Sequence, residues 1–592
     1  MHTAMEQIEN RTPKIDKQTE QAAAPEIAQT PERRAVEWEP NSEQERVGLH
    51  IVQLLQESGA EAYFVGGYGR DLLMSQLPEQ YPDMRFNPND IDIATSLPYQ
   101  DARAVLEQGG YAAFKETGEN FKVLNVIIAI GGKHAEFEIA TFRTESDYGK
   151  NRKPMNVRET RDIREDVARR DFTIGALYFD PVQEKILDYV GGMKDIEERV
   201  LRTVNDPYER LVAEDPMRML RYVRFRATYN MKFDRGAQSV MREHGAVLAD
   251  RDRISPERVK EEFDKILKLP RAAFAIADMA RLGLLEHTVP EVYALIETEH
   301  APQNAKSEMH REGSAYQHTL ETMRAIARPE FVAQAREKLN LDGALSNSEV
   351  VEQFYKKYGV VWQWANLLHD AGKAETQEPA RDALGATARH RFYGHEQRSR
   401  ELLNAVARRL RFSNQEKQDV AFLVENHMSA HNIGSRGNHK LRKSTKAELF
   451  RNEQAEALLF LSLADDIGNF TEGKSAQDAV ERFSRAWKEL QGFREQEKAR
   501  ERQGAADRQI SNAIVEAFFG GEQTAPKKGS PIIGLVKEHV RTLLDEGELA
   551  PGDVERAIAD AKQRLDDDDI DYLRFPGDME KFKQKVSQIF AN

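Results

Sequence analysis

Apolar residues recur along this chain with two different spacings, and each spacing predicts a different kind of element. Over residues 42–59 they fall on one face of a helix, at Val47, Ile51, Val52, Leu54 and Leu55. A short apolar run at 63–65 and strand-like stretches at 90–96, 122–130 and 135–142 follow. Beyond about residue 200 the helical spacing prevails. The pattern therefore predicts an α+β fold in which a region of strands and helices precedes a region of helices.

Other parts of the chain show neither spacing. Residues 1–40 are rich in Glu, Gln, Pro and Ala, and we predict that they are disordered. Residues 75–89 hold three prolines and are predicted to be a local insertion. Near the C-terminus, a charged run at 493–508 and a Pro/Gly/Lys break at 523–531 precede amphipathic segments, which predicts a helical tail.

Composition narrows the class of protein. With 592 residues, 40% hydrophobic and 31% charged, the chain is expected to fold into several soluble domains. It contains no cysteine, so any metal site must use His, Asp or Glu. The start of the chain lacks the apolar core of a signal peptide, and no apolar run approaches the ~20 residues of a membrane span. These features predict a cytoplasmic protein without a membrane partner.

The charge of the chain says less about its binding partners than the composition says about its class. The net charge of −14 does not by itself point to nucleic acid, although a multi-domain protein can carry a basic groove beside acidic tails. The strongest local basic patch lies at Arg436, His439, Lys440, Arg442, Lys443 and Lys446. That patch fits either contact with RNA phosphates or an ordinary solvated loop.

The most informative stretch runs from Tyr63 to Ser96. Its apolar run leads into the glycine turn Gly66-Gly67-Tyr68-Gly69-Arg70-Asp71 and then into a helix. Backbone N–H groups at such a turn can bind phosphate. Asp90 and Asp92 follow on one face of a strand, and two adjacent carboxylates favour a divalent cation such as Mg²⁺. Each motif alone also fits a plain turn or a solvated strand edge.

Two later motifs add charged side chains that could bind a nucleotide. Arg169-Arg170-Asp171 offers two guanidinium groups for a triphosphate and an acid that can hold one of them. Residues 214–225 are predicted to form one helix, on which Asp215 and Arg218 share a face. Together they could present acceptors and donors to a base edge, or form an ordinary intrahelical ion pair.

In this order, the motifs resemble the class II tRNA nucleotidyltransferase and bacterial poly(A) polymerase family, almost continuously up to about residue 290. The resemblance implies a head with a mixed sheet of the polymerase β type. It also implies that Asp90 and Asp92 bind Mg²⁺ and that Glu138 is a third acid, unless Glu138 only lies on a solvated strand face. The nucleotide would be bound by Gly66, Gly67, Arg70, Asp71, Arg169, Arg170, Asp171, Asp215, Arg218 and Arg221.

Two positions depart from the family pattern. Where the family has an Asn associated with the nucleotide sugar, this chain has Gly175, which has no side chain for that contact. Relatives often have His-Gly after an earlier turn, but this chain has Gly118-Glu119-Asn120-Phe121. Recognition of the nucleotide ribose through that Asn side chain is therefore in question.

The second half carries a different set of motifs. Five short motifs, each behind an apolar helical run, contain His318, His369-Asp370, His395, His427 and Asp465. A lone His in a helical domain would be an ordinary packed or surface residue. Together and in this order, the five motifs resemble the HD phosphohydrolase domain. Imidazoles and carboxylates that converge from several helices bind transition ions. The resemblance implies one divalent transition metal (Mn, Ni, Co, Fe or Zn) on His318, His369, Asp370 and Asp465, and a second site completed by His395 and His427.

The sequence thus predicts a two-part enzyme. We expect residues 41–200 to form the catalytic head, 201–300 an all-helical neck, 301–490 an all-helical HD domain and 491–592 the tail. The predicted reaction is the addition of CCA to the 3′ end of tRNA from CTP and ATP, with no obligate protein partner, beside an HD phosphohydrolase activity. A poly(A) polymerase, an enzyme adding only CC or A, and a degenerate RNA-binding head that serves the HD domain remain alternatives.

Overall fold

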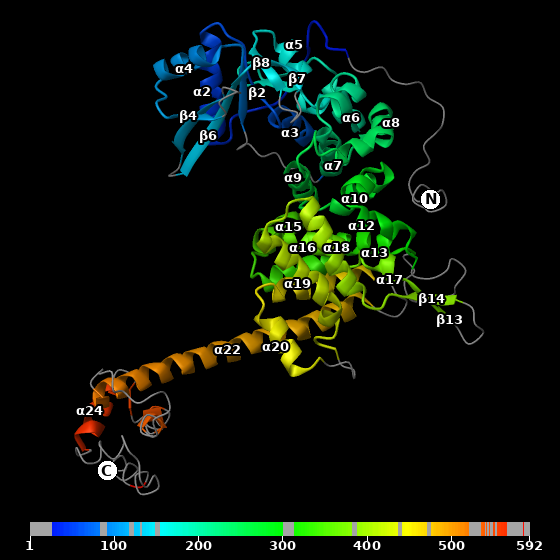
Figure 1. The fold of residues 1–592 in the computed structure, drawn as a ribbon. Coiled ribbons are helices and arrows are strands. Elements are labelled where there is room, and N and C mark those ends of the chain that lie inside the picture. The colour runs from blue at the N-terminus through cyan, green and yellow to red at the C-terminus, as the bar shows by residue number, and fades with distance from the viewer. Residues whose placement is uncertain are drawn as a thin grey trace. The chain divides into compact units, whose positions relative to one another are not determined.

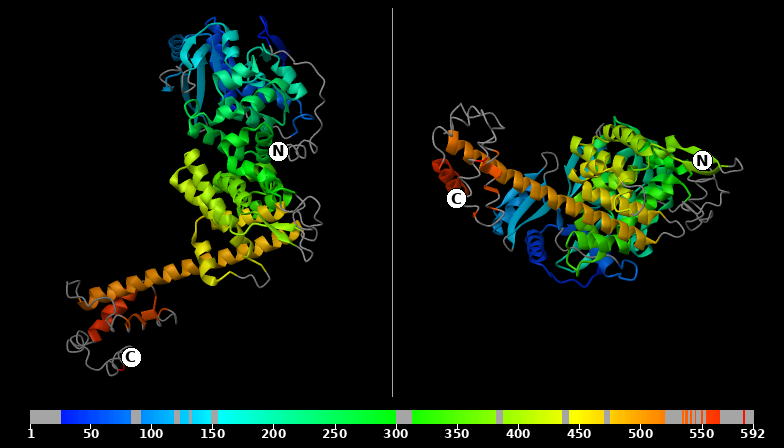
Figure 2. Two further views of the ribbon diagram at one scale, coloured as in Figure 1. Left: turned by 45° about the vertical axis from the view of Figure 1, so that its right-hand side comes forward. Right: turned by 90° about the horizontal axis from the view of Figure 1, so that it is seen from below.

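The computed structural model describes residues 26–82, 91–117, 123–130, 133–148, 154–299, 313–381, 387–435, 441–469 and 475–519, with short stretches between 534 and 564 and residue 584. The chain divides into two compact units. The first comprises residues 1–441 and 454–485, and the second comprises residues 442–453 and 486–592. In Figures 1 and 2 the first part of the described chain, with both strands and helices, is blue to cyan, and the mainly helical part that follows is green to yellow.

An eight-stranded mixed sheet organises the head, as the family resemblance implied. Its strand order is β1-β10-β9-β2-β3-β6-β5-β4. Strands β3 and β6 are parallel, whereas the other neighbouring pairs are antiparallel. The strands are β1 (Glu32–Ala35), β2 (Ala62–Val65), β3 (Asp92–Thr95), β4 (Phe114–Thr117), β5 (Val123–Ile130), β6 (Lys133–Thr141), β9 (Leu177–Asp180) and β10 (Lys185–Asp188).

Side chains alternate between the two faces of this sheet and form a core on each. On one face Phe64 packs against α2 (Glu43–Glu57), beside α4 (Tyr99–Gln108). On the other face Tyr63, Val65 and Ala94 pack with Tyr178 and with α5 (Ile163–Ala168). The second face also carries Asp92, because Asp92 and Ala94 are two residues apart on β3.

The prediction of disorder for residues 1–40 is wrong for residues 26–40. Glu32–Ala35 forms strand β1, which pairs with β10 at the edge of the sheet. Val36 and Trp38 are buried, and the Trp38 indole donates a hydrogen bond to the Tyr68 hydroxyl at 2.7 Å. Two apolar residues among charged neighbours gave no periodic signal, so only packing on the sheet reveals their role.

The head has further elements outside this sheet. They are α3 (Tyr68–Ser75), β7 (Arg143–Tyr148), β8 (Pro154–Glu159), the 3-10 helix η1 (Thr173–Gly175) and α6 (Gly192–Glu198). Strands β7 and β8 form a separate hairpin.

The neck is almost entirely helical, but a short parallel pair, β11 (Val200–Leu201) with β12 (Lys232–Phe233), departs from the all-helical prediction. Each strand has only two residues, and η2 and α7 lie between them in the chain, so no periodic pattern marks the pairing. The helices are η2 (Glu209–Glu214), α7 (Met217–Tyr229), α8 (Arg235–His244), η3 (Gly245–Ala249), α9 (Pro256–Leu267), α10 (Ala272–Arg281), α11 (Leu284–Thr288), α12 (Pro290–Tyr293) and η4 (Ala294–Glu297).

The next region is a helical bundle with one antiparallel hairpin, β13 (Glu378–Arg381) with β14 (Thr387–Arg391), that the all-helical prediction missed. The hairpin interrupts the helices between two of the predicted ligand motifs. The helices are α13 (Ala315–Arg324), η5 (Ala325–Ala327), α14 (Pro329–Lys338), α15 (Asn347–Tyr358), α16 (Val361–Leu368), α17 (Lys373–Thr376), α18 (His395–Arg409), α19 (Asn414–His431) and α21 (Ala455–Gly468).

Three further helices with described bounds are α20 (Lys443–Arg451), α22 (Ala476–Phe519) and α24 (Val554–Arg564). Helix α22 is 44 residues long, begins in the first unit and continues in the second. In the described ranges, no helix combines the length and apolar character needed to cross a bilayer.

Candidate functional site

The glycine turn lies directly against Asp92. Gly66 has φ +72°, a conformation that favours glycine. A Cβ atom placed on Gly66 would lie 2.8 Å from Oδ2 of Asp92, so a side chain there would collide with the carboxylate. The absence of a side chain therefore lets the backbone turn approach the acid closely.

Glu138 lies beside Asp92 on the neighbouring strand. The two residues are register partners in the parallel pair β3–β6, so both side chains project from the same sheet face. Glu138 is exposed. Two adjacent carboxylates on an accessible face suit a hard divalent cation. Asp90, the other predicted metal ligand, lies outside the described residues.

Arg70 is anchored by both the head and the neck. Its Nε lies 2.6 Å from Oδ1 of Asp71, and its Nη2 lies 3.0 Å from Oδ2. Its guanidinium carbon lies 4.4 Å from the centre of the Tyr229 ring on α7. The side chain is largely buried, and a Cβ at Gly67 would lie 2.8 Å from its Nη2. These contacts fix the direction in which Arg70 can present its charge.

Asp166, which the sequence reading passed over, holds both arginines of the Arg169-Arg170 motif. Its Oδ1 lies 2.7 Å from Nη2 of Arg169, and its Oδ2 lies 3.0 Å from Nη2 of Arg170. Burial raises the pKa of the Asp166 carboxyl, but Arg170 and Arg169 outweigh that effect and leave it well below its usual range. The Tyr178 hydroxyl donates to the same carboxylate at 2.5 Å.

Asp171 has a different partner from the one predicted. It was expected to hold an arginine of its own motif, but it bonds instead to Arg218 at 2.5 Å and to Arg221, both on α7. Burial opposes ionisation of Asp171, yet these two guanidinium groups lower its pKa. The chain spacing hid this contact because the residues are 47 and 50 positions apart.

The predicted helix over residues 214–225 is also wrong at its start. Asp215 has an extended backbone, and α7 begins only at Met217, after Pro216. Oδ1 of Asp215 accepts a hydrogen bond from the Met217 N–H at 3.1 Å, and its Oδ2 pairs with Arg258 at 2.8 Å. Asp215 and Arg218 therefore belong to a wider network and are not neighbours on one helix face.

The other basic and loop motifs add little to this site. Arg436, His439 and Lys440 of the basic patch and the segment 118–121 lie outside the described residues. Within the patch, Lys446 lies on α20 and pairs with Glu489 at 2.5 Å. A Cβ built on Gly175 would have no atom within 4 Å, so open space adjoins this position.

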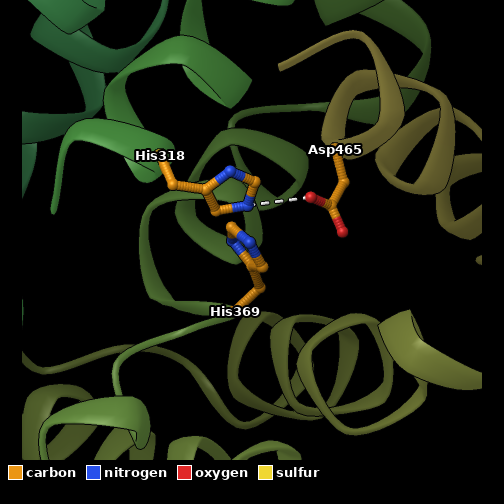
Figure 3. Close-up of side chains that lie close together, drawn as sticks. All are labelled: His318, His369 and Asp465. Atoms are coloured by element: carbon orange, nitrogen blue, oxygen red, sulfur yellow. Dashed lines mark ion pairs between the residues drawn. The ribbon is translucent and has the colours of Figure 1, made fainter. Parts of the chain in front are cut away.

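The helical bundle gathers the six predicted HD ligands in its interior, where all six are buried. One group of three is His318, His369 and Asp465, whose possible ligand atoms lie within 4.8 Å of one another. Figure 3 shows these three side chains converging from three helical segments, with Nε2 of His318 2.9 Å from Oδ1 of Asp465. The second group is Asp370, His395 and His427.

Asp370 faces both groups, whereas the sequence reading assigned it to the first. Its Oδ2 lies 3.6 Å from Nε2 of His318 and 3.4 Å from that of His369. Its Oδ1 lies 3.3 Å from Nε2 of His395 and 3.7 Å from that of His427. A carboxylate with one oxygen toward each group can bridge two ions.

The histidine rings are oriented as metal ligands. In His369, His395 and His427, Nδ1 lies 2.7–2.8 Å from the backbone carbonyl three residues earlier. Since a carbonyl only accepts, Nδ1 carries the hydrogen and the neutral ring keeps a lone pair on Nε2. Nε2 of His369 is buried without a hydrogen-bond partner, and those of His395 and His427 lie 3.2 Å apart. Facing lone pairs fit a site that binds a cation.

The two histidines of the second group differ in proton affinity. Burial lowers the pKa of His427 to about 3, which keeps that ring neutral at ordinary pH. Burial also opposes protonation of His395, but the hydrogen bond and charge of Asp370 outweigh it and raise its pKa. His427 is therefore a ready metal ligand at neutral pH, whereas His395 must release any proton it holds.

Two residues around this cluster were not predicted. Nζ of Lys373 lies 2.6 Å from Oδ2 of Asp370. Nε2 of His431 lies 2.6 Å from Oδ2 of Asp465, on the side away from His318. The spacing of His427 and His431, one helical turn apart on α19, was the available signal for the second contact.

Three family models match parts of this chain. Residues 62–202 match the model described as "Poly A polymerase head domain". Residues 230–295 match "Probable RNA and SrmB- binding site of polymerase A", and residues 347–469 match "HD domain". The chain therefore carries regions similar to a poly(A) polymerase head domain, to its probable RNA-binding segment and to an HD domain. Domains of the first and last kinds usually bind divalent metals, and the six buried His and Asp ligands fit one.

Individual relatives match part of the chain. A CCA-adding enzyme of Geobacillus sp. (strain WCH70) is 36% identical over 246 residues, which are 40% of this chain and 52% of that protein. A CCA-adding enzyme of Bacillus licheniformis is 34% identical over 236 residues, 40% of this chain and 53% of that protein. The chain thus matches about half the length of each. The crystal structure of a Bacillus stearothermophilus CCA-adding enzyme in complex with CTP is 19% identical, covering 92% of this chain and 100% of that one, with a TM-score of 0.45.

Proposed function

We propose that the head adds CCA to the 3′ end of tRNA from CTP and ATP. The observation that carries the proposal is the placement of Asp92 and Glu138 on one sheet face, against the glycine turn at Gly66. The CCA-adding enzymes that match this chain over more than 200 residues support the same function. The cytoplasm, where tRNA and nucleotides occur together, would be the place of action.

In this reaction the 3′-hydroxyl oxygen of the RNA attacks the α-phosphorus of the nucleotide, and pyrophosphate leaves with the electrons of the broken P–O bond. Asp90, Asp92 and Glu138 would hold Mg²⁺, which lowers the pKa of the attacking hydroxyl and neutralises the triphosphate. The N–H groups at Gly66 and Gly67 would bind phosphate oxygens.

Two sets of arginines would bind different parts of the nucleotide, the triphosphate and the base. Arg70, kept in place by Asp71, and Arg169 and Arg170, kept in place by Asp166, would bind the triphosphate. Arg218 and Arg221, oriented by Asp171, would present donors to the base, and Asp215 would supply an acceptor. No template strand is needed if these side chains select the base.

We further propose that the HD domain hydrolyses phosphate esters. His318, His369, Asp370 and Asp465 would hold one divalent transition ion and Asp370, His395 and His427 a second, and such ions lower the pKa of bound water. Buried Asp370, with its pKa well below the usual range despite burial because of His369 and Lys373, stays ionised as a ligand at neutral pH. We also infer that the predicted head (41–200), extended by strand β1 at its N-terminal side, the neck (201–300), the HD domain (301–490) and the tail (491–592) are the functional regions.

The decisive experiment incubates the protein with tRNA lacking CCA, Mg²⁺, and labelled CTP and ATP, separately and together. We expect three added nucleotides with both, and none with Asp92→Asn. A long ladder with ATP alone would identify a poly(A) polymerase, and arrest after two C residues or addition of A only would identify a partial activity. No addition to any RNA would indicate a degenerate head and overturn the proposal.

A further inference from the structure

The two groups of arginines in the head and neck are connected through Arg210. Arg169 and Arg170 are held by Asp166, whereas Arg218 and Arg221 are held by Asp171. The first pair lies at the end of α5 and the second lies on α7, so their relative position depends on contacts between these elements.

Arg210 fixes the backbone of the first pair. It lies on η2, and its side chain is 2% exposed. Its Nη2 donates to the carbonyl oxygen of Ala168 at 2.7 Å and also to that of Arg170, so it holds the backbone on both sides of Arg169. The planar guanidinium fixes both the distance and the direction of these bonds.

Glu214 carries the connection to the second pair. Its carboxylate pairs with Nη1 of Arg210 and also, at 2.5 Å, with Nη1 of Arg218. The same nitrogen of Arg218 lies 3.3 Å from the carbonyl oxygen of Arg210. Arg210 and Glu214 thus join the backbone beside Arg169 to the side chain of Arg218.

The segment that carries both residues has unusual geometry. Glu209–Glu214 is a π-helix, a conformation that is rare and concentrated at functional sites. Arg210 and Glu214 are its second and last residues. The wide turn therefore brings Arg210 to the backbone at 168–170 while Glu214 stays beside α7.

We propose that Arg210 and Glu214 are positioning residues that set the spacing between the triphosphate-binding arginines and the base-selecting arginines, and so determine which nucleotide is accepted. This inference rests on the proposed function of the head. Neither residue is assigned a contact with the nucleotide. If the spacing relaxes, a bound triphosphate no longer places the base in register with Arg218, and discrimination between bases falls.

The test measures kcat and KM for CTP and UTP on tRNA lacking CCA, and for ATP and GTP on tRNA ending in CC, with full-length Arg210→Lys and Glu214→Gln. Lysine keeps the charge but cannot make the forked contact. We expect the CTP/UTP and ATP/GTP ratios of kcat/KM to fall about tenfold in each variant, a change of roughly 1.4 kcal/mol in discrimination. The double variant should lose about as much as either single one, because both act through one contact.

Arg226→Lys is the matched control. Arg226 is also on α7 and pairs with buried Asp278, but it is not part of the Arg210–Glu214 connection. This variant should lower the unfolding temperature and keep the nucleotide ratios. The inference is overturned if folded Arg210→Lys or Glu214→Gln keeps the wild-type ratios, or if Arg226→Lys lowers them equally. Glu214 is 25% exposed, so its variant provides the test if Arg210→Lys does not fold. Failure of the wild type to add nucleotides would instead overturn the proposed function.

Discussion

Asp166 holds Arg169 and Arg170, the two arginines that we propose bind the triphosphate. It is fully buried and neutralises two guanidinium groups. Removing one partner of a buried ionic network leaves the others without compensation, which typically costs about 3–5 kcal/mol. We therefore predict that Asp166→Asn lowers the unfolding temperature of the head and raises KM for both nucleotides, as measured by calorimetry and steady-state kinetics.

The pH dependence of this variant has a defined sign. The folded-state pKa of Asp166 lies below its ordinary value of 3.8, so the stabilisation is present above that value and declines as the pH falls through it. The difference in stability between wild type and Asp166→Asn should be largest near pH 7 and shrink below about pH 4. A difference that grows in acid would contradict the assignment.

Gly175 gives a second prediction at this scale. Because a Cβ here would meet no atom within 4 Å, Gly175→Asn should fold with wild-type stability. The new amide would occupy the position that the family associates with the nucleotide sugar, so we expect a higher ratio of CTP to dCTP use. Gly192→Ala is the steric contrast, since its Cβ would meet the Thr173 carbonyl oxygen at 2.3 Å and should destabilise the head. An unchanged sugar preference would remove Gly175 from nucleotide recognition.

Helix α19 carries His427, a proposed metal ligand, and His431, which contacts the proposed ligand Asp465. His427 faces Asp370, and His431 one turn later bonds to the second oxygen of Asp465. Groups that orient a metal ligand typically contribute 10–100-fold to affinity. We predict that His431→Ala weakens Mn²⁺ or Ni²⁺ binding by about that factor in calorimetric titration. His390→Ala, whose imidazole bonds to a backbone carbonyl elsewhere, should bind metal like wild type.

Strand β1 makes the N-terminal region part of the head. A chain starting at Glu26 keeps every described contact of β1, whereas one starting at Glu43 loses the pairing with β10 and the buried Trp38. Loss of a buried Trp side chain alone typically costs about 3–5 kcal/mol. We predict a wild-type unfolding temperature for the first truncation and a clear decrease for the second. Equal unfolding temperatures would show that β1 contributes nothing to stability.

At the scale of the whole molecule, the two proposed chemistries use separate sets of residues. Asp92 lies on the head sheet, and Asp370 lies at the end of α16 in the helical bundle. Asp370→Asn should therefore abolish metal-dependent hydrolysis of p-nitrophenyl phosphate and leave nucleotide addition intact. Asp92→Asn should do the reverse. Loss of both activities in either folded variant would show that the domains act as one catalytic unit.

Local sequence patterns predicted many of the residues at the two candidate sites. The glycine turn between β2 and α3 depends only on neighbouring residues in the chain. The six HD ligands were readable as motifs, but their grouping was not. Asp370 was assigned to one metal site, whereas its two oxygens face both groups.

The amino-acid sequence by itself determined the order of domains and the chemical types available to each site, because periodicity and motif spacing are local properties of the chain. Only the tertiary structure decided which charges pair. Asp171 bonds to α7 and leaves Arg169 and Arg170 to Asp166, and Arg210 reaches the backbone of residues about 40 positions away. Such choices depend on distances created by packing, and any of several acids in the sequence could have satisfied each arginine.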